Sequence, residues 1–261
     1  MIKRFWPGIL LKQYKYELIA FCINISIALL AFKFKDNVAV FLGVVVISII
    51  SLFFIIYNKT KDKDFFWLPL NKPGKIKDWV GRGKFIYIHN ERSFEITNSN
   101  VGYLLPKTIL WDDYRFEFDF KIVNKTVAWI VRASGLSNYV MFQCTFEGIN
   151  PHIRIDGEWI QYKHSDINFS FLEALDPDIW YRGVAICEKR SIRNIIYRVK
   201  DGEVVFDRHW KIPEGEVISK EEGNNQKIKY FKNIDFDFGA VGFRNYGSER
   251  GFIKNVYIEK I

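Results

Sequence analysis

The chain has 261 residues, a formal net charge of +8, three cysteines, and a composition that is 49% hydrophobic and 17% aromatic. That length fits a short anchor plus one domain of roughly 200 residues. The cysteine pattern does not indicate an oxidised disulfide framework, so we interpret the cysteines as buried small hydrophobes. Much of the basic excess flanks the N-terminal apolar segments, and the rest of the chain is nearly balanced. We therefore expect no nucleic-acid partner.

Two N-terminal apolar segments predict a membrane anchor. Residues 38–57 form an uncharged run, and a helix of that length, rising about 1.5 Å per residue, matches a hydrocarbon core of about 30 Å. Residues 18–32 are shorter and span only if the charged flanks snorkel. No clean cleavage site of a signal peptide follows them. We predict an anchor in the lipid bilayer over 1–58, with transmembrane helices at about 16–34 and 38–57; this hairpin also offers a surface for homo-oligomerisation.

The basic residues around these segments predict the orientation. The two outer flanks carry more lysine and arginine than the connecting turn, which offers Lys33 and Lys35. By the positive-inside rule, the N-terminus and the C-terminal domain then face the cytoplasm. The chain is thus expected to be an integral protein of the cell membrane. The flanking basic residues are Lys3, Arg4, Lys12, Lys15, Lys59, Lys61 and Lys63.

Residues 59–78 mix charges with aromatic side chains and predict a juxtamembrane linker. Its aromatic cluster, Phe65, Phe66 and Trp67, suits the headgroup level of a bilayer. The simpler alternative is a linker docked on the domain that follows.

From residue 79 onward, short segments with a period of two predict β-strands. Residues 115–122 alternate polar and apolar side chains strictly, as a strand with one buried face does. Turn signals separate such segments and favour an all-β antiparallel sandwich or barrel over 79–261. Residues 214–229 are polar and predict a long surface loop. The other expected strands are 85–88, 93–97, 127–133, 139–145, 152–155, 181–187, 195–200, 239–244 and 251–259, with turns at 148–151, 156–157 and 201–202.

Four stretches of this domain resemble a known superfamily. They are Trp111-Asp112-Asp113-Tyr114 leading into 115–122, 128–132 with 138–142, Trp180-Tyr181-Arg182, and 239–244 with 251–258. They are similar to the concanavalin A-like lectin/glucanase superfamily, in particular its LamG-like and family-16-hydrolase-like modules. The resemblance implies a jelly-roll β-sandwich over 79–261. It implies less about function, because one fold hosts many activities.

The resemblance also gives a test for catalysis. Family-16 glycosidases carry three acidic residues on one strand face, and the nearest match here is Glu117, Asp119 and Lys121. An ammonium cannot replace the protonated carboxylic acid of that mechanism, so we expect no enzymatic activity. We interpret this face as a solvated outer surface with cross-strand ion pairs. The four histidines lack metal-ligand spacing, and we expect neither a metal nor a cofactor.

With catalysis not expected, ligand binding is the remaining function, and two groups of residues are candidates for the binding site. Arg244, Asn245, Tyr246 and Arg250 lie in one segment between the last two expected strands, where two guanidinium groups would suit a carboxylate, a phosphate or sugar hydroxyls. Aromatic side chains that could stack on a sugar are Trp159, Tyr162, Trp210 and Tyr246. The alternatives are that these aromatics pack in the core or rim, and that Arg244 pairs with Glu249 and closes the loop.

Three functions stay open at this point. The first is a membrane-anchored, non-catalytic, lectin-like recognition module for a glycan or a protein partner. The second is a two-span membrane effector with a cytoplasmic ligand-sensing sandwich, which resembles antiphage effectors in architecture alone. The third is an atypical glycoside hydrolase.

Overall fold

The computed structural model describes residues 65–68, 70–72, 76–161, 169–212, 217–219, 227–229 and 236–261. In these ranges the chain is β-structure and loops with one short 3-10 helix, η2 (Pro106–Thr108). The helices predicted at 16–34 and 38–57 lie outside the described residues, as does Tyr162. Within the described ranges, no helix has the length and apolar character needed to cross a bilayer.

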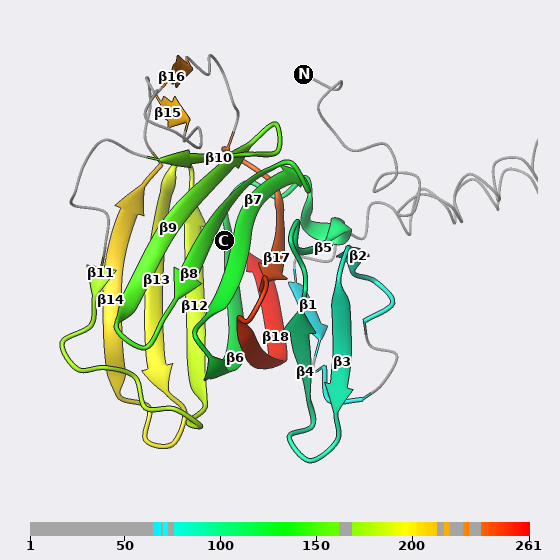
Figure 1. Ribbon diagram of the computed structural model, residues 1–261, viewed down its shortest axis with the longest axis vertical. Coiled ribbons are helices and arrows are strands. Elements are labelled where there is room, and N and C mark those ends of the chain that lie inside the picture. Colours follow the sequence, from blue (N-terminus) through cyan, green and yellow to red (C-terminus); the bar gives the residue numbers. More distant parts are fainter. Residues whose placement is uncertain are drawn as a thin grey trace, which may run out of the picture. The chain divides into compact units, whose positions relative to one another are not determined.

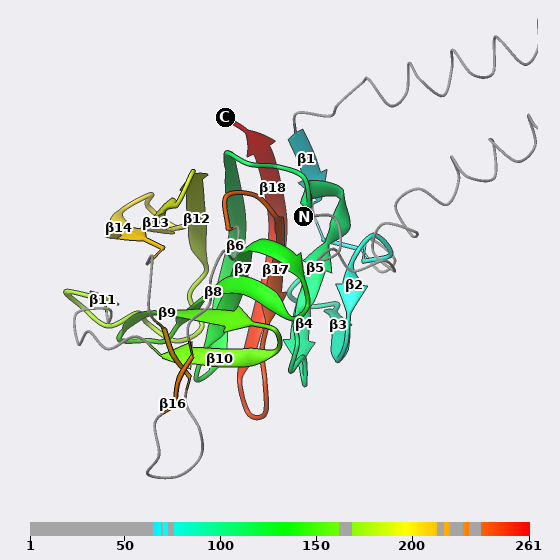
Figure 2. The same cartoon turned by 90° about the horizontal axis from the view of Figure 1, so that it is seen from above.

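The strands form two antiparallel sheets packed as layers (Figures 1 and 2). In sheet A the order is β14-β13-β12-β6-β18-β4-β3, and β1 also pairs with β18. The bounds are β1 (Phe65–Leu68), β3 (Lys84–Ile88), β4 (Ser93–Thr97), β6 (Tyr114–Asn124), β12 (Tyr181–Glu188), β13 (Ser191–Arg198), β14 (Val204–Lys211) and β18 (Arg250–Lys260).

Sheet B lies in front of sheet A in Figure 1, with the order β16-β15-β10-β9-β8-β7-β17-β5-β2 and with β11 on β9. The bounds are β2 (Val80–Gly81), β5 (Tyr103–Leu105), β7 (Val127–Gly135), β8 (Asn138–Cys144), β9 (Gly148–Ile155), β10 (Glu158–Gln161), β11 (Phe169–Ser170), β15 (Val217–Ser219), β16 (Lys227–Lys229) and β17 (Ala240–Arg244). The predicted two-sheet antiparallel sandwich is confirmed.

Aromatic side chains fill the space between the sheets. On β6 the alternation sends Phe116, Phe118 and Phe120 inward, where all three are fully buried. The ring of Phe118 lies 5.4 Å from that of Trp129 and 5.0 Å from that of Phe243, both from sheet B. Burying one such side chain contributes about 1.5–3 kcal/mol. The core therefore fixes which side of each strand faces outward.

Three local expectations change in the structure. Residues 148–151 were expected to turn, yet they begin β9; the chain reverses earlier, where the backbone N–H of Thr145 donates to the Gly148 carbonyl at 2.8 Å. The polar segment 214–229, expected to be a loop, contains β15 and β16, because Ile218 pairs with both Gln161 and Ile228. The strand β14 was not predicted, since its sequence lacks a regular alternation.

The strand β1 lies inside the range 59–78 that was predicted as a linker. It pairs with the C-terminal half of β18. Phe66 stacks on Trp111 at 5.3 Å, while Phe65 and Trp67 point away and are 58% and 55% exposed. The sheet thus begins at Phe65.

The cysteines of the described residues behave as small hydrophobes. Cys144 and Cys187 are free and fully buried. Burial raises the pKa of the Cys187 thiol to about 12 and that of the Cys144 thiol well above its usual value. Both thiols are therefore protonated and unreactive at neutral pH.

Candidate functional site

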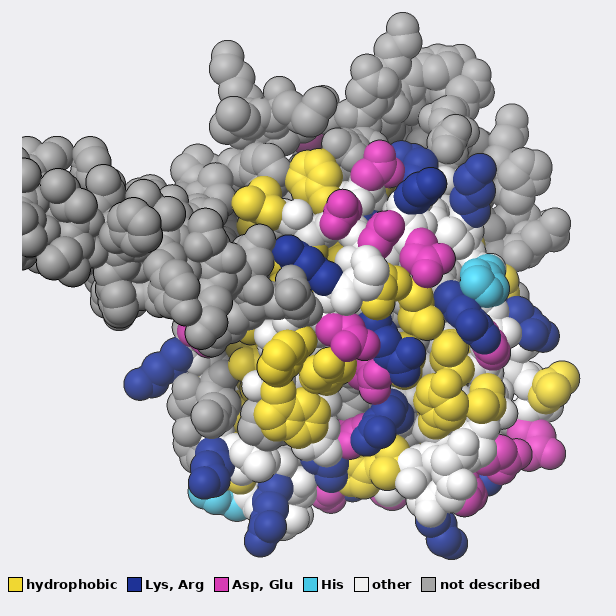
Figure 3. Space-filling view, turned by 180° about the vertical axis from the view of Figure 1, so that it is seen from behind, with side chains coloured by type: hydrophobic (Ala, Val, Ile, Leu, Met, Phe, Trp, Pro, Cys, Tyr) yellow, Lys and Arg dark blue, Asp and Glu magenta, His cyan; other side chains and the backbone are white. Residues whose placement is uncertain are grey.

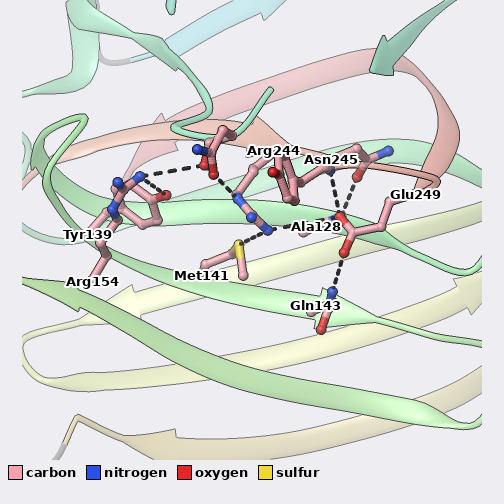
Figure 4. Close-up of polar contacts among 10 residues, drawn as sticks. Ala128, Tyr139, Met141, Gln143, Arg154, Arg244, Asn245 and Glu249 are labelled. Atoms are coloured by element: carbon pink, nitrogen blue, oxygen red, sulfur yellow. Dashed lines mark hydrogen bonds and ion pairs between the residues drawn. The ribbon is translucent and has the colours of Figure 1, made fainter. Parts of the chain in front are cut away.

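The outer face of sheet B is set by the register of its central strands. On β8, Val140 and Phe142 belong to the core, so Tyr139, Met141 and Gln143 face away from it. Opposite them on β9 stand Arg154, His152 and Asn150, respectively. Trp159 of β10 pairs with Arg154, and Arg244 of β17 pairs with Ala128 of β7. We call Tyr139, His152, Arg154, Trp159, Arg244 and Tyr246 the sheet B site. Figure 4 shows the polar contacts around three of these residues, Tyr139, Arg154 and Arg244.

Arg244 lies at the centre of the sheet B site. Its Nε donates to the backbone carbonyl of Asn100 at 2.9 Å, and its guanidinium carbon lies 4.9 Å from the Trp159 ring centre and 5.6 Å from that of Tyr246. Arg244 is only 7% exposed, and this burial lowers the pKa of its guanidinium. The group nevertheless stays charged at neutral pH, because a guanidinium is effectively always protonated.

Arg154 reaches the same place from β9. Its Nη1 lies 3.3 Å from the Tyr139 hydroxyl and 3.5 Å from the Asn100 carbonyl oxygen, and its Nε donates to the Gly157 carbonyl. Its guanidinium carbon is 5.5 Å from the Trp159 ring centre. One indole thus contacts two guanidinium groups, which also share one carbonyl oxygen.

The loop after β17 holds Tyr246 in place. Asn245 is 1% exposed, and its Oδ1 accepts the N–H of Ala128 at 3.2 Å. Glu249 accepts one hydrogen bond from Gln143 Nε2 and one from the backbone N–H of Tyr246, each at 2.7 Å. Tyr246 itself is 51% exposed. A fixed loop therefore presents an aromatic ring to solvent beside Arg244.

His152 completes the face with a neutral ring. Its ring centre lies 5.9 Å from that of Trp159, and its buried Nε2 has no hydrogen-bond partner among the described residues. Burial, together with the nearby charge of Arg244, lowers the pKa of His152 to about 4. The imidazole is therefore uncharged at neutral pH.

Three of the sequence-predicted residues join this site, and others do not. Arg244, Tyr246 and Trp159 come together, and Asn245 anchors the loop. Arg250 does not join Arg244: the turn closed by the Glu249 N–H and the Tyr246 carbonyl carries the chain from sheet B to sheet A, where Arg250 binds Glu95. The expected pair of Arg244 with Glu249 is present, with 3.9 Å between Nη1 and Oε2.

Trp210, predicted to stack on a sugar, instead packs in the core. It is 6% exposed and lies in the core, with its ring 5.5 Å from Phe142, because its position on β14 faces inward opposite Ile192. Sequence reasoning also missed Tyr139, His152 and Arg154. All three lie on strands that the sequence predicted, 139–145 and 152–155, but the turn expected at 148–151 separated Asn150 from the alternation that His152 and Arg154 continue.

The outer face of sheet A differs from the expected solvated surface. Asp119 is 2% exposed and Lys121 is 7% exposed. The predicted cross-strand pairing is present, since Arg182 stands opposite Asp119 and its Nε lies 2.9 Å from the carboxylate. Burial arises because Trp180, Phe252 and Glu91 cover Lys121, whose Nζ is 2.6 Å from Glu91. Nowhere in the described ranges do three or more candidate ligand side chains gather in a metal-binding arrangement.

Comparisons with known proteins find solved structures at low sequence identity and with TM-scores below 0.5. No protein-family model matches the chain, and no curated protein matches it. Among solved structures, the carbohydrate-binding module CBM66 from Bacillus subtilis is 13% identical, with a TM-score of 0.46 over 70% of this chain and 96% of that chain. A Bacillus subtilis protein of unknown function with a galectin-like fold is 11% identical, with a TM-score of 0.47 over 75% and 94%. Lectin II from Ulex europaeus is 10% identical, with a TM-score of 0.43 over 75% and 97%.

Proposed function

We propose that this chain is a membrane-anchored, non-catalytic recognition module that binds a glycan at the sheet B site. The observation that carries the proposal is the combination of the Trp159 and Tyr246 rings with the guanidinium groups of Arg154 and Arg244. Aromatic rings pack on the apolar faces of sugars, and fixed planar donors bind their hydroxyl oxygens. Partly exposed aromatics beside such donors on a rigid sheet are suited to this ligand class.

The carboxylates support a role without catalysis. Retaining glycosidases hold two carboxyl groups about 5–5.5 Å apart, one of them protonated. Beside the sheet B site, the carboxylate of Glu249 lies 3.9 Å from Arg244, and both of its oxygens accept hydrogen bonds. On sheet A, Asp119 is held by Arg182 and by Asn255 Nδ2 at 2.6 Å. These carboxylates are engaged in holding the structure.

Glycan binding is tested with the full chain in an uncharged detergent on a glycan array. Wild-type protein should bind a restricted set of glycans, and Tyr246→Ala should lose most of that signal. The matched control is Tyr197→Ala, on β13 of sheet A, which should bind as wild type does. A protein that binds no glycan, or a Tyr246→Ala variant that binds as wild type does, would refute the proposal.

Membrane anchoring draws support from β1. Phe65 and Trp67 are more than half exposed on a strand that begins just after the apolar run 38–57 and its lysines, and such aromatics suit a membrane interface. The full chain should sediment with membranes and resist carbonate extraction. A chain lacking residues 1–63 should be soluble and folded, and sedimentation of that fragment with membranes would contradict the anchor.

The orientation, with the sandwich in the cytoplasm, needs an introduced label. The native thiols of Cys144 and Cys187 are buried, whereas Leu172 is 96% exposed. Leu172→Cys should therefore react with an impermeant maleimide in inverted vesicles and stay unlabelled in intact cells. Labelling in intact cells would place the domain outside.

A further inference from the structure

We infer that the glycan bound at the sheet B site carries an anionic group, a carboxylate or a phosphoryl group, held between Arg154 and Arg244. The inference rests on the proposed function and specifies its ligand class. It comes from the way in which the two guanidinium groups meet. Arg154 Nη1 and Arg244 Nε approach the same Asn100 carbonyl oxygen, at 3.5 and 2.9 Å.

Two like charges that converge on one point repel each other, and an opposite charge placed between them offsets that repulsion. The charge of Arg154 contributes to the lowered pKa of Arg244. The aromatic rings of Tyr139, Trp159 and Tyr246 stabilise the guanidinium groups through cation-π contacts. They carry no formal charge, however, and so leave the site cationic.

The protein itself offers little neutralisation here. In the part of the chain that the structure describes, Arg154 has carbonyl and phenol partners but no carboxylate partner. The carboxylate nearest to Arg244 belongs to Glu249, at 3.9 Å, and it already accepts hydrogen bonds from Gln143 and from the backbone of Tyr246. His152 is neutral. The site therefore has two cationic side chains and one partly engaged anion.

The two guanidinium groups also keep hydrogen-bond donors for a ligand. Within the described ranges, Arg154 makes its hydrogen bonds through Nε and Nη1. Arg244 uses Nε for a hydrogen bond and Nη1 for contacts with Met141 Sδ and Glu249 Oε2, each at 3.9 Å. The Nη2 atoms make no hydrogen bond to a described residue. A planar carboxylate or a phosphoryl group accepts two or more such donors at once, which a single hydroxyl cannot do. An anionic group thus uses both the charge and the geometry of the pair.

The first test is the composition of the bound glycans. The array should hold neutral, uronate-bearing, sialylated, phosphorylated and sulfated glycans, with the full chain in an uncharged detergent. Bound glycans should carry carboxylate or phosphoryl groups, and the two arms distinguish these sources. Binding of neutral glycans alone would overturn the inference and leave the proposed function intact. Binding of no glycan would overturn both.

The second test is a matched ligand pair. If the ligand carries a carboxylate, its methyl ester should bind at least tenfold more weakly, as measured by calorimetry. If the ligand carries a phosphoryl group, the dephosphorylated sugar should bind at least tenfold more weakly. Arg154→Gln and Arg244→Gln should each remove most of this preference at unchanged melting temperature. If Arg244→Gln unfolds, Arg154→Gln, whose side chain is only partly buried, decides alone. Arg193→Gln on sheet A is the control and should keep the preference. Equal affinity of wild type for acid and ester would overturn the inference.

Discussion

The outer faces of the two sheets use charge in opposite ways. On sheet A, arginines and lysines meet carboxylates: Arg182 with Asp119 at 2.9 Å, Lys121 with Glu91 at 2.6 Å, and Arg193 with Asp207 at 2.6 Å. Figure 3 shows this face, where acidic and basic side chains alternate around apolar patches. On sheet B, two arginines stack on aromatics and converge on one carbonyl. Charge is therefore balanced on the outer face of sheet A and unbalanced on that of sheet B, where we propose that the ligand binds.

The largest expected change in stability comes from removing a carboxylate from the outer face of sheet A. Asp119→Ala removes a carboxylate that is 2% exposed and takes away the hydrogen-bond acceptor of Arg182 Nε and Asn255 Nδ2. Two hydrogen bonds to a buried charged group are lost, at about 1.5–3 kcal/mol of unfolding free energy each. Ligand affinity should stay unchanged under folding conditions. Denaturant unfolding measures the loss, with the partly exposed Asp207→Ala as the control at less than about 1 kcal/mol. Equal losses in both variants would contradict the structural role of Asp119.

The two faces should also differ in the pH range over which they lose stability. His152 has a folded pKa of about 4, below its ordinary value of 6.5, so the unfolded chain binds more protons between these values. Stability should therefore fall as the pH drops from about 6.5 to 4, by up to about 3 kcal/mol. On sheet A, pairing with Lys121 lowers the pKa of Glu91 from 4.5, and its contribution is lost only below that pH.

The measurement is thermal unfolding from pH 4 to pH 8. Wild-type melting temperature should fall through the histidine window, and His152→Leu should flatten that part of the profile. A profile that is the same in the variant and in wild type would show that His152 remains solvated and titrates normally.

The sequence predicted features that depend on neighbouring residues and missed those that depend on strands distant in the chain. Local alternation predicted β6, and the Asp156-Gly157 signal correctly predicted a tight hairpin turn, since both residues have positive φ. The association of Arg244 with Trp159 was not predictable, because it depends on β10, β9, β8, β7 and β17 lying in that order. The burial of Asp119 and Lys121 was also missed. It depends on Trp180 and Glu91, which reach the strand from distant loops.

The smallest expected change in free energy gives the sharpest test of the two faces, because each face carries a tryptophan with a cation packed against its ring. Arg244 lies 4.9 Å from the Trp159 ring centre, and Lys254 Nζ lies 3.5 Å from that of Trp180. If only the unbalanced face binds ligand, Trp159→Ala should weaken binding at least tenfold, about 1.4 kcal/mol, while Trp180→Ala should leave affinity unchanged. Calorimetric titration with a glycan identified on the array measures both. Because both indoles are partly buried and hold a cation, both substitutions should lower the melting temperature by similar, modest amounts. A loss of affinity in both variants would mean that binding follows general stability, and a loss in Trp180→Ala alone would move the site to sheet A.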